Sequence, residues 1–218
     1  MMGIYSLLQL KDISLASLIA EFGNVEGNFL KNVGLGIDEN EVIPYTESPT
    51  VKSVGRQYCL PHNEYNKRIV LQNIYELCEE VSIKLRRLHK KARSAGVAIR
   101  GTNSFHGHKT YKAYFSTGKD MFAMCSSVIE QYKEVFYSGY VRQIGVWAGN
   151  LEDTSNTPLS LFETPKSEKL LKTIDVLNDK FGDHTIRNGF LLYADKLTTV
   201  PNGWMADTYE RTLLSTAF

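Results

Sequence analysis

The residues of this chain that are best placed to do chemistry are those that could hold a phosphate group. The segment Lys52-Ser53-Val54-Gly55-Arg56 combines a hydroxyl, a glycine and a guanidinium. A glycine lets backbone amides approach a phosphate closely, and an arginine adds a positive charge. Gly23 and Gly27 lie between two short apolar stretches, where amides at a helix N-terminus could hold a second phosphate. A structural turn explains these two glycines equally well.

Other patterns do not build a catalytic or metal centre. His106 and His108 would face one side of a strand, but zinc requires three or four ligands. Cys59 and Cys125 are not spaced to supply the missing ligands. No serine or cysteine is accompanied by a base and an orienting group, and no glycine-rich phosphate loop is present. We therefore expect neither a metal site nor a cofactor in this chain.

The hydrophobic pattern divides the chain into a small helical part, a linker and a larger mixed part. Short helices separated by glycines are expected at Ser6–Leu10, Ser14–Phe22 and Glu26–Leu35. Ser14 is placed to cap the second of these helices, and Gly23 to end it. Residues 39–51 carry acids and prolines without a helical period, which is typical of an exposed linker.

The larger part is expected to form an α+β fold. A strand over Val51–Leu60 leads into a long helix over Glu64–Ser94, which Gly96 ends and whose apolar residues recur every three or four positions from Val70 to Leu88. The next expected elements are strands at Val97–Asn103 and Lys109–Ser116 around a turn at Ser104–His108, a helix at Asp120–Ser138 and a strand at Tyr140–Ala148. This order predicts a four-stranded sheet with both helices on one face and the other face free. A polar loop at 150–166, a third helix at Ser167–Phe181 and an extended segment at Ile186–Tyr193 follow, and the tail 196–218 shows no period.

The charge of the chain is unevenly distributed, although the net charge is only +1. Residues 49–149 hold 16 basic and 7 acidic side chains, whereas residues 1–48 and 150–218 are net acidic. A basic centre of this kind is the footprint expected for a polyanion such as nucleic acid. Lysines and arginines gathered on one solvated helix face would give the same balance.

Composition and cysteine usage indicate a folded cytoplasmic protein. A chain that is 43% hydrophobic and 22% charged is neither disordered nor a small disulfide-stapled scaffold. No apolar run is long enough to cross a membrane, and no secretory signal is visible at the N-terminus. The three cysteines, which include Cys78, show no paired spacing and are expected to be reduced.

Several segments, taken in order, resemble the C-terminal half of the Y-family (translesion) DNA polymerases, and most closely the bacterial members. They are Gly3-Ile4-Tyr5-Ser6-Leu7-Leu8-Gln9-Leu10, Phe22-Gly23, Gly36-Ile37-Asp38, Lys52-Ser53-Val54-Gly55-Arg56, Val141-Arg142-Gln143-Ile144-Gly145-Val146, Leu159-Ser160-Leu161-Phe162 and Asn178-Asp179-Lys180-Phe181-Gly182-Asp183-His184-Thr185-Ile186-Arg187. The resemblance implies a partial thumb at 1–38 that is like a helix-hairpin-helix, a linker at 39–51 and a DNA-binding little finger at 52–149. A loop at 150–166, a helix and strand at 167–195 and a tail at 196–218 complete the chain.

The resemblance also implies which residues contact primer-template DNA. Those that match the family pattern are Ser53, Gly55, Arg56, Arg100, Thr102, Lys109, Thr110 and Arg142 in the little finger, with Gly23 and Gly27 as thumb contacts to phosphate. The chain departs from the family in the middle hairpin. There His106-Gly107-His108-Lys109 follows Phe105, where the family usually has threonine and arginine.

By the same resemblance, the palm domain is absent from this chain. In the family, palm carboxylates bind two metal ions and align the incoming nucleotide. Asp38-Glu39 is the only adjacent Asp-Glu pair in the sequence, and it falls at the end of the thumb. We therefore expect no nucleotidyl transfer by this chain, and a magnesium requirement only in the parent polymerase.

The segment Leu159-Ser160-Leu161-Phe162 resembles the peptide by which bacterial polymerases bind the sliding clamp. Leu159, Leu161 and Phe162 would be its apolar anchors, and Pro158 stands where the family has glutamine. A loop that packs back onto the third helix is the alternative interpretation. Oligomeric state is not indicated by the sequence.

The residues leave two other functions open. An RNA-binding module has the same order of strands and helices, and Tyr111, Tyr114 and Phe115 could stack on bases. A pure protein-interaction module would depend on the clamp-like loop, and its basic centre would be incidental.

Overall fold

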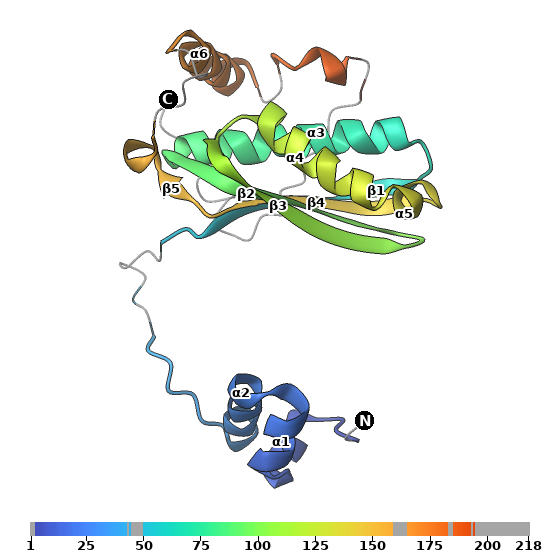
Figure 1. The fold of residues 1–218 in the computed structure, drawn as a ribbon, viewed down its shortest axis with the longest axis vertical. Helices are drawn as coiled ribbons and strands as arrows, with labels where there is room; N and C mark the ends of the chain where they lie inside the picture. The colour runs from blue at the N-terminus through green and yellow to red at the C-terminus, as the bar shows by residue number, and fades with distance from the viewer. Residues whose placement is uncertain are drawn as a thin grey trace. The chain divides into compact units, whose positions relative to one another are not determined.

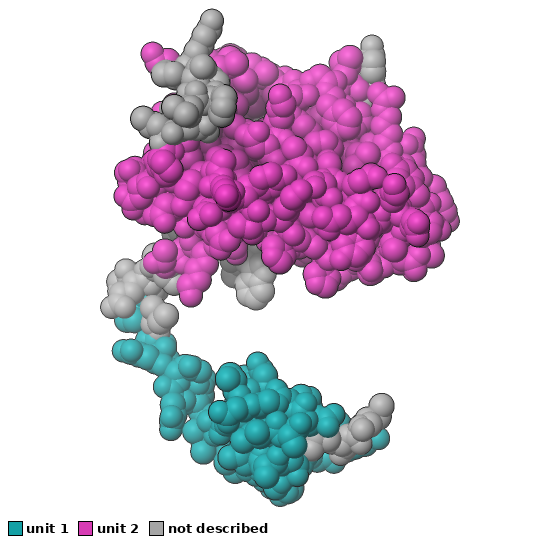
Figure 2. All heavy atoms as spheres, viewed as in Figure 1, with its two compact units in different colours: residues 1–49 teal, residues 50–218 magenta. Residues whose placement is uncertain are grey.

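The structure is a computed structural model of the chain, and it describes residues 3–42, 44, 50–158, 165–182, 185–192 and 194. The chain forms two compact units, which we call the helical unit (residues 1–49) and the sheet unit (residues 50–218) (Figure 2). The division between them falls within residues 39–51. Among the described residues, no helix is long and apolar enough to span a bilayer.

The helical unit contains a 3-10 helix, η1 (Leu7–Asp12), and the helices α1 (Leu15–Phe22) and α2 (Asn24–Leu35). The predicted helices are therefore present, and α2 begins two residues before the expected Glu26. Ser14 caps α1, because its Oγ accepts the N–H of Ser17 at 3.1 Å. Gly23 ends α1 and precedes α2 with φ +84°, a conformation that favours glycine.

The sheet unit is built on an antiparallel sheet with strand order β1-β4-β2-β3 (Figure 1). The strands are β1 (Ser53–Glu64), β2 (Lys90–Gly101), β3 (Ser104–Phe115) and β4 (Val141–Gly149). The helices α3 (Lys67–Arg87) and α4 (Gly118–Gln131) cover one face of this sheet, as predicted (Figure 1). The sequence did not predict a short strand, β5 (Glu152–Asp153), which pairs with the start of β2.

The bounds of the long helix were wrong at both ends. Asn66 caps α3, since its Oδ1 accepts the N–H of Arg68 at 3.0 Å, so β1 runs on to Glu64. At the other end His89 has φ +53° and turns the chain into β2. Gly96, which was expected to end the helix, therefore lies inside a strand. The apolar stripe of α3 from Val70 to Leu85 is buried as predicted.

Three further boundaries differ from the sequence prediction. The turn between β2 and β3 occupies residues 102–103, so the expected turn at Ser104–His108 belongs to β3. The helix expected at Asp120–Ser138 is split into α4 and the short α5 (Lys133–Tyr137). The segment expected to be extended at Ile186–Tyr193 instead holds a 3-10 turn, η3 (Gly189–Leu191), in its described part. Asn188 caps this turn, because its Oδ1 accepts the N–H of Phe190 at 2.9 Å.

The C-terminal segment packs on the outer side of α3. Its helix α6 (Pro165–Phe181) and η3 follow a short turn, η2 (Thr154–Asn156). Gln72 Nε2 of α3 donates to the carbonyl of Phe190 at 2.8 Å, and Leu191 is buried. Asp175 of α6 receives two hydrogen bonds from Arg86, at 2.6 and 2.7 Å. Helix α3 is thus enclosed between the sheet and this segment, which explains why polar residues on its outer side, among them Glu76, are buried.

Candidate nucleic-acid interface

The sheet unit has one sheet face that α3 and α4 do not cover, which we call the open face. Successive residues of a strand point to opposite faces, and the residues between the buried core positions therefore form the open face. In the part of the sheet where all four strands pair, they are Ser53, Gly55, Gln57 and Cys59 of β1, Gln143, Gly145, Trp147 and Gly149 of β4, Ser94, Gly96, Ala98 and Arg100 of β2, and Ser104, His106, His108 and Thr110 of β3. The register aligns them in four cross-strand rows, such as Cys59, Gln143, Arg100 and Ser104.

Small and uncharged side chains dominate the open face. Among the residues just named there is no carboxylate, and Arg100 is the only lysine or arginine. Trp147 lies across Gly96, because a Cβ built at Gly96 would be 2.2 Å from Trp147 Cζ2. The result is a flat surface that a polyanion could approach closely without electrostatic repulsion.

A line of hydrogen bonds crosses three strands at one end of the open face. Arg100 Nη1 donates to Gln143 Oε1 at 3.3 Å, and Gln143 Nε2 donates to Gln57 Oε1 at 3.3 Å. The hydrogen bond to Gln143 orients the exposed guanidinium of Arg100 and uses one of its N–H groups. Since a guanidinium has five N–H donors, others can bind a phosphate.

The structure brings four of the predicted DNA-contact residues onto one surface. Ser53, Gly55, Arg100 and Thr110 all lie on the open face. Thr110 Oγ1 donates to Ser94 Oγ across the strands at 3.2 Å.

Arg56 and Lys109 point to the opposite face of the sheet. Arg56 Nε lies 3.4 Å from Glu80 Oε2 of α3, and Lys109 Nζ donates to Ser127 Oγ of α4 at 2.8 Å. Arg56 and Lys109 therefore cannot contact a partner that binds the open face. The cause is strand geometry, since Arg56 is three residues from Ser53 and Lys109 is next to Thr110.

Thr102 and Arg142 lie at the end of the sheet where β2 ends and β4 begins. The N–H of Thr102 donates to Tyr140 O, and its Oγ1 accepts the N–H of Tyr140, both at 3.1 Å. The exposed side chain of Arg142 donates to the carbonyl of Leu60. Thr102 thus supports the turn, while Arg142 stays at the surface beside the row of Arg100.

Gly23 and Gly27, the predicted thumb contacts, stabilise the packing of α1 and α2 in the helical unit. Gly27 N–H donates to Gly23 O at 2.9 Å inside α2, and Gly23 N–H donates to Ile19 O at 2.8 Å. A Cβ at Gly27 would lie 2.7 Å from Ile19 N, so the glycine permits α1 and α2 to pack closely. Neither amide is turned toward solvent in this arrangement, and the phosphate contact at these glycines stays a prediction.

The basic centre is partly neutralised within the sheet unit. Arg86 and Arg87 pair with Asp175 and Asp179 of α6, and Lys90 Nζ lies 2.9 Å from Asp153 of β5. The net charge of residues 49–149 therefore overstates the charge offered to a partner. Sequence reasoning missed these pairs because they join residues far apart in the chain.

The cysteines and histidines do not form a reactive or metal-binding cluster in the residues that the structure describes. Cys78 and Cys125 are buried in the core, and burial raises the pKa of the Cys78 thiol well above its usual value. Cys59 is exposed on the open face. A magnesium site needs several oxygen ligands, so the described residues do not fit one.

Of the three aromatic residues of the RNA-binding alternative, Tyr114 alone follows the strand alternation of the open face. Phe115 is buried in the core, and the ring of Tyr114 lies 5.4 Å from the guanidinium carbon of Arg93. Tyr111 lies beneath the ammonium group of Lys109, which faces α4. The three rings therefore do not lie together as one platform for base stacking. The clamp-like residues Leu159, Leu161 and Phe162 lie outside the described residues.

Known proteins share sequence with most of this chain. Residues 51–161 match the impB/mucB/samB family C-terminal domain. DNA polymerase IV 2 of Halalkalibacterium halodurans is 28% identical over 192 residues, which are 85% of this chain and 46% of that protein. UvrX of Bacillus subtilis, whose name refers to UV-damage repair, is 30% identical over 194 residues, 85% of this chain and 45% of that protein. Among solved structures, a Y-family DNA polymerase chimera matches with a TM-score of 0.49 at 18% identity. The matched region covers 69% of this chain and 42% of the chimera. This chain thus spans about half the length of the curated relatives it matches.

Proposed function

Because the chain belongs to the impB/mucB/samB family and corresponds to the C-terminal part of bacterial Y-family DNA polymerases, we propose that its open face binds primer-template DNA in lesion bypass. The observation that carries this proposal is the composition of that face. It combines small residues, an arginine held at the surface and no carboxylate among the named positions. Such a surface suits contacts with the sugar-phosphate backbone, which position a protein on DNA without reading its sequence.

Replacing Arg100 by alanine should weaken the salt dependence of DNA binding. Each phosphate that a protein neutralises contributes about −0.9 to the slope of log affinity against log salt, so the slope should flatten by about one unit. Base preference should not change, since a phosphate contact reads no sequence. Fluorescence anisotropy with a labelled primer-template, at several salt concentrations, measures the slope.

The matched control is Arg68→Ala, which removes an exposed arginine from the start of α3 on the helix-covered side. Its slope should equal that of the unchanged chain. A slope near zero in the unchanged chain, or an equal effect of both variants, would contradict DNA binding by the open face.

We also propose that this chain alone performs no nucleotidyl transfer, although relatives are named DNA polymerases. Template-directed extension needs carboxylates that hold two metal ions, and the described residues bring no such group together. Primer extension with magnesium and all four nucleotides should therefore give no product above background. A full-length relative serves as the positive control, and extension by carefully purified chain would refute the proposal.

The loop at 158–162 is proposed to dock on the sliding clamp, with Leu161 and Phe162 as anchors. Burying an apolar side chain contributes about 1.5–3 kcal/mol, whereas the family glutamine replaced here by Pro158 would add a hydrogen bond of about 0.5–1.5 kcal/mol. Binding should therefore be weak but measurable by titration against the clamp of the same cell. The double variant Leu161→Ala, Phe162→Ala should abolish it, and Pro158→Gln should strengthen it. Equal binding by the chain and the double variant would dismiss this partner.

A further inference from the structure

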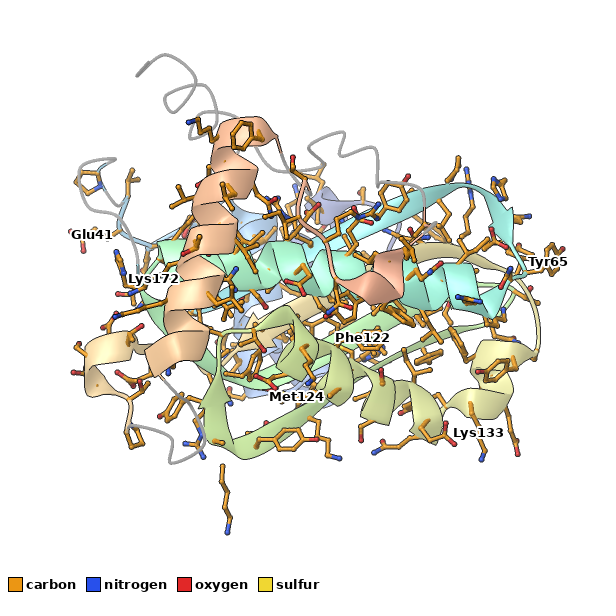
Figure 3. The ribbon with its side chains drawn as sticks, turned by 90° about the horizontal axis from the view of Figure 1, so that it is seen from above. Glu41, Tyr65, Phe122, Met124, Lys133 and Lys172 are labelled. Carbon is orange, nitrogen blue, oxygen red and sulfur yellow. The ribbon has the colours of Figure 1, made fainter. Side chains whose placement is uncertain are left out.

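Exposed tyrosines gather at one end of the sheet, next to the row that contains Arg100. Tyr65 directly follows β1, and Tyr140 directly precedes β4, which is the neighbour of β1. Their rings meet edge to face, with centroids 5.9 Å apart. Tyr65 is nevertheless 68% exposed, and Figure 3 shows it at the margin of the sheet unit.

A third tyrosine lies at the same end and is fixed in a similar way. Tyr137 is 62% exposed, and its ring packs edge to face on Phe136 at 5.1 Å. Lys67, two residues after Tyr65, lies 5.4 Å from the centroid of the Phe136 ring and donates to the carbonyl of Gly139. These contacts tie the start of α3 to α5, and the ring contacts with Tyr140 and Phe136 restrict the rings of Tyr65 and Tyr137 before any partner binds. A preorganised ring binds at a lower entropic cost than a mobile one.

Two exposed arginines belong to the same end of the sheet. Arg100 and Arg142 are both exposed, and each is anchored by a hydrogen bond, to Gln143 and to the carbonyl of Leu60. The nearest carboxylate along β1, that of Glu64, is buried and accepts the N–H of Asn66 at 2.7 Å. An aromatic surface beside arginines that remain available to phosphates has the composition of a single-strand binding site.

We propose that this tyrosine end binds the unpaired bases of the template strand, with Tyr65 as the stacking platform. The proposal rests on the function proposed above, because the tyrosines continue the surface on which the duplex would lie. The duplex would occupy the open face, and the single strand would leave it past Arg100 and Arg142. Exposed aromatics and arginines also suit a protein partner, but the continuity with a carboxylate-free face favours nucleic acid.

The test compares a blunt duplex with a duplex of equal paired length that carries a 5′ single-stranded overhang of thymines. The chain should bind the overhang substrate more tightly than the blunt one. Tyr65→Ala should lower affinity for the overhang substrate about tenfold and leave blunt-duplex affinity unchanged, since one base stack is lost. Tyr65→Phe should retain the affinity, because stacking needs the ring and not the hydroxyl.

A direct readout of stacking is the fluorescence of 2-aminopurine in the overhang. Binding should quench it in the unchanged chain and in Tyr65→Phe, but not in Tyr65→Ala. Tyr111→Ala is the matched control, since it removes a partly exposed tyrosine near the far end of β3. It should change neither affinity nor quenching.

The outcomes distinguish a failure of this inference from a failure of the proposed function. Blunt-duplex binding without any gain from the overhang, or with a gain that Tyr65→Ala does not reduce, overturns the inference and leaves duplex binding standing. An equal loss on both substrates in Tyr65→Ala overturns it as well, because the ring would then contact the duplex. Absence of binding to either substrate refutes both proposals.

Discussion

Replacing Arg187 by alanine should lower the free energy of unfolding of the sheet unit by about 1.5–3 kcal/mol, because it removes a charged hydrogen-bond donor from a buried carboxylate. Arg187 Nη2 lies 3.1 Å from Glu76 Oε2, and the Glu76 side chain on α3 is only 1% exposed. Arg187 Nη1 also donates to the carbonyl of Ala194 at 3.1 Å. Urea unfolding of the full chain, followed by circular dichroism, measures the change.

Arg87→Ala is the matched control for this prediction. Arg87 also pairs with a C-terminal carboxylate, that of Asp179, but the two side chains are 48% and 54% exposed. A solvent-exposed ion pair contributes less than about 1 kcal/mol, so this variant should unfold almost like the unchanged chain. Similar losses in the two variants would show that burial does not distinguish the pairs.

The contact between Arg187 and Glu76 illustrates what the sequence could not predict. The sequence predicts an extended segment at Ile186–Tyr193, yet the structure has a 3-10 turn at Gly189–Leu191. Tertiary packing stabilises the turn, because the ring of Phe190 lies 5.5 Å from that of Tyr75 and 5.6 Å from that of Phe122. These contacts join residues 115 and 68 positions apart, and local periodicity does not indicate them.

Elements with a strong local signal were predicted well. The apolar stripe of α3 predicted a buried helix, and Ser14 and Gly23 correctly marked the ends of α1. The end of α3 was misplaced because Lys90–Arg93 continues a basic, helix-compatible stretch. Its strand conformation comes from pairing with β5 and β3, which is a tertiary effect.

The candidate site was only half predictable for a different reason. Strand alternation alone predicts that Arg56 points to the opposite face from Ser53, and Lys109 to the opposite face from Thr110. The family resemblance instead predicted all four residues as DNA contacts, without regard to the face of the sheet. The cross-strand rows could not be foreseen, because the order β1-β4-β2-β3 and the register follow from the complete sheet. The neutralisation of Arg86 by Asp175 likewise needs the position of α6.

Placing two carboxylates on the open face by the double substitution Gln57→Glu, Gln143→Glu should weaken DNA binding about a hundredfold at low salt. Like charges brought together across an interface cost several kcal/mol, and a factor of ten corresponds to about 1.4 kcal/mol. A second effect acts in the same direction. Gln143 already accepts a hydrogen bond from Arg100 at 3.3 Å, so a glutamate there would pair with the guanidinium and compete with phosphate. Anisotropy titrations with primer-template DNA at about 50 mM salt measure the loss.

Gln131→Glu provides the control, since Gln131 is exposed at the end of α4 on the helix-covered side. Gln131→Glu adds one isosteric negative charge and the open-face variant adds two, so the loss of binding free energy in the open-face variant would be twice that of the control if only the net charge of the chain mattered. The open-face variant should bind far more weakly than this control, and urea unfolding verifies that both variants are folded under the conditions of the titration. An equal loss of binding free energy per added charge would mean that DNA is attracted by the overall field and does not lie on the open face. A large difference would locate the phosphates beside Gln57 and Gln143, because a glutamate on the far side of the sheet acts only through the screened field of the protein.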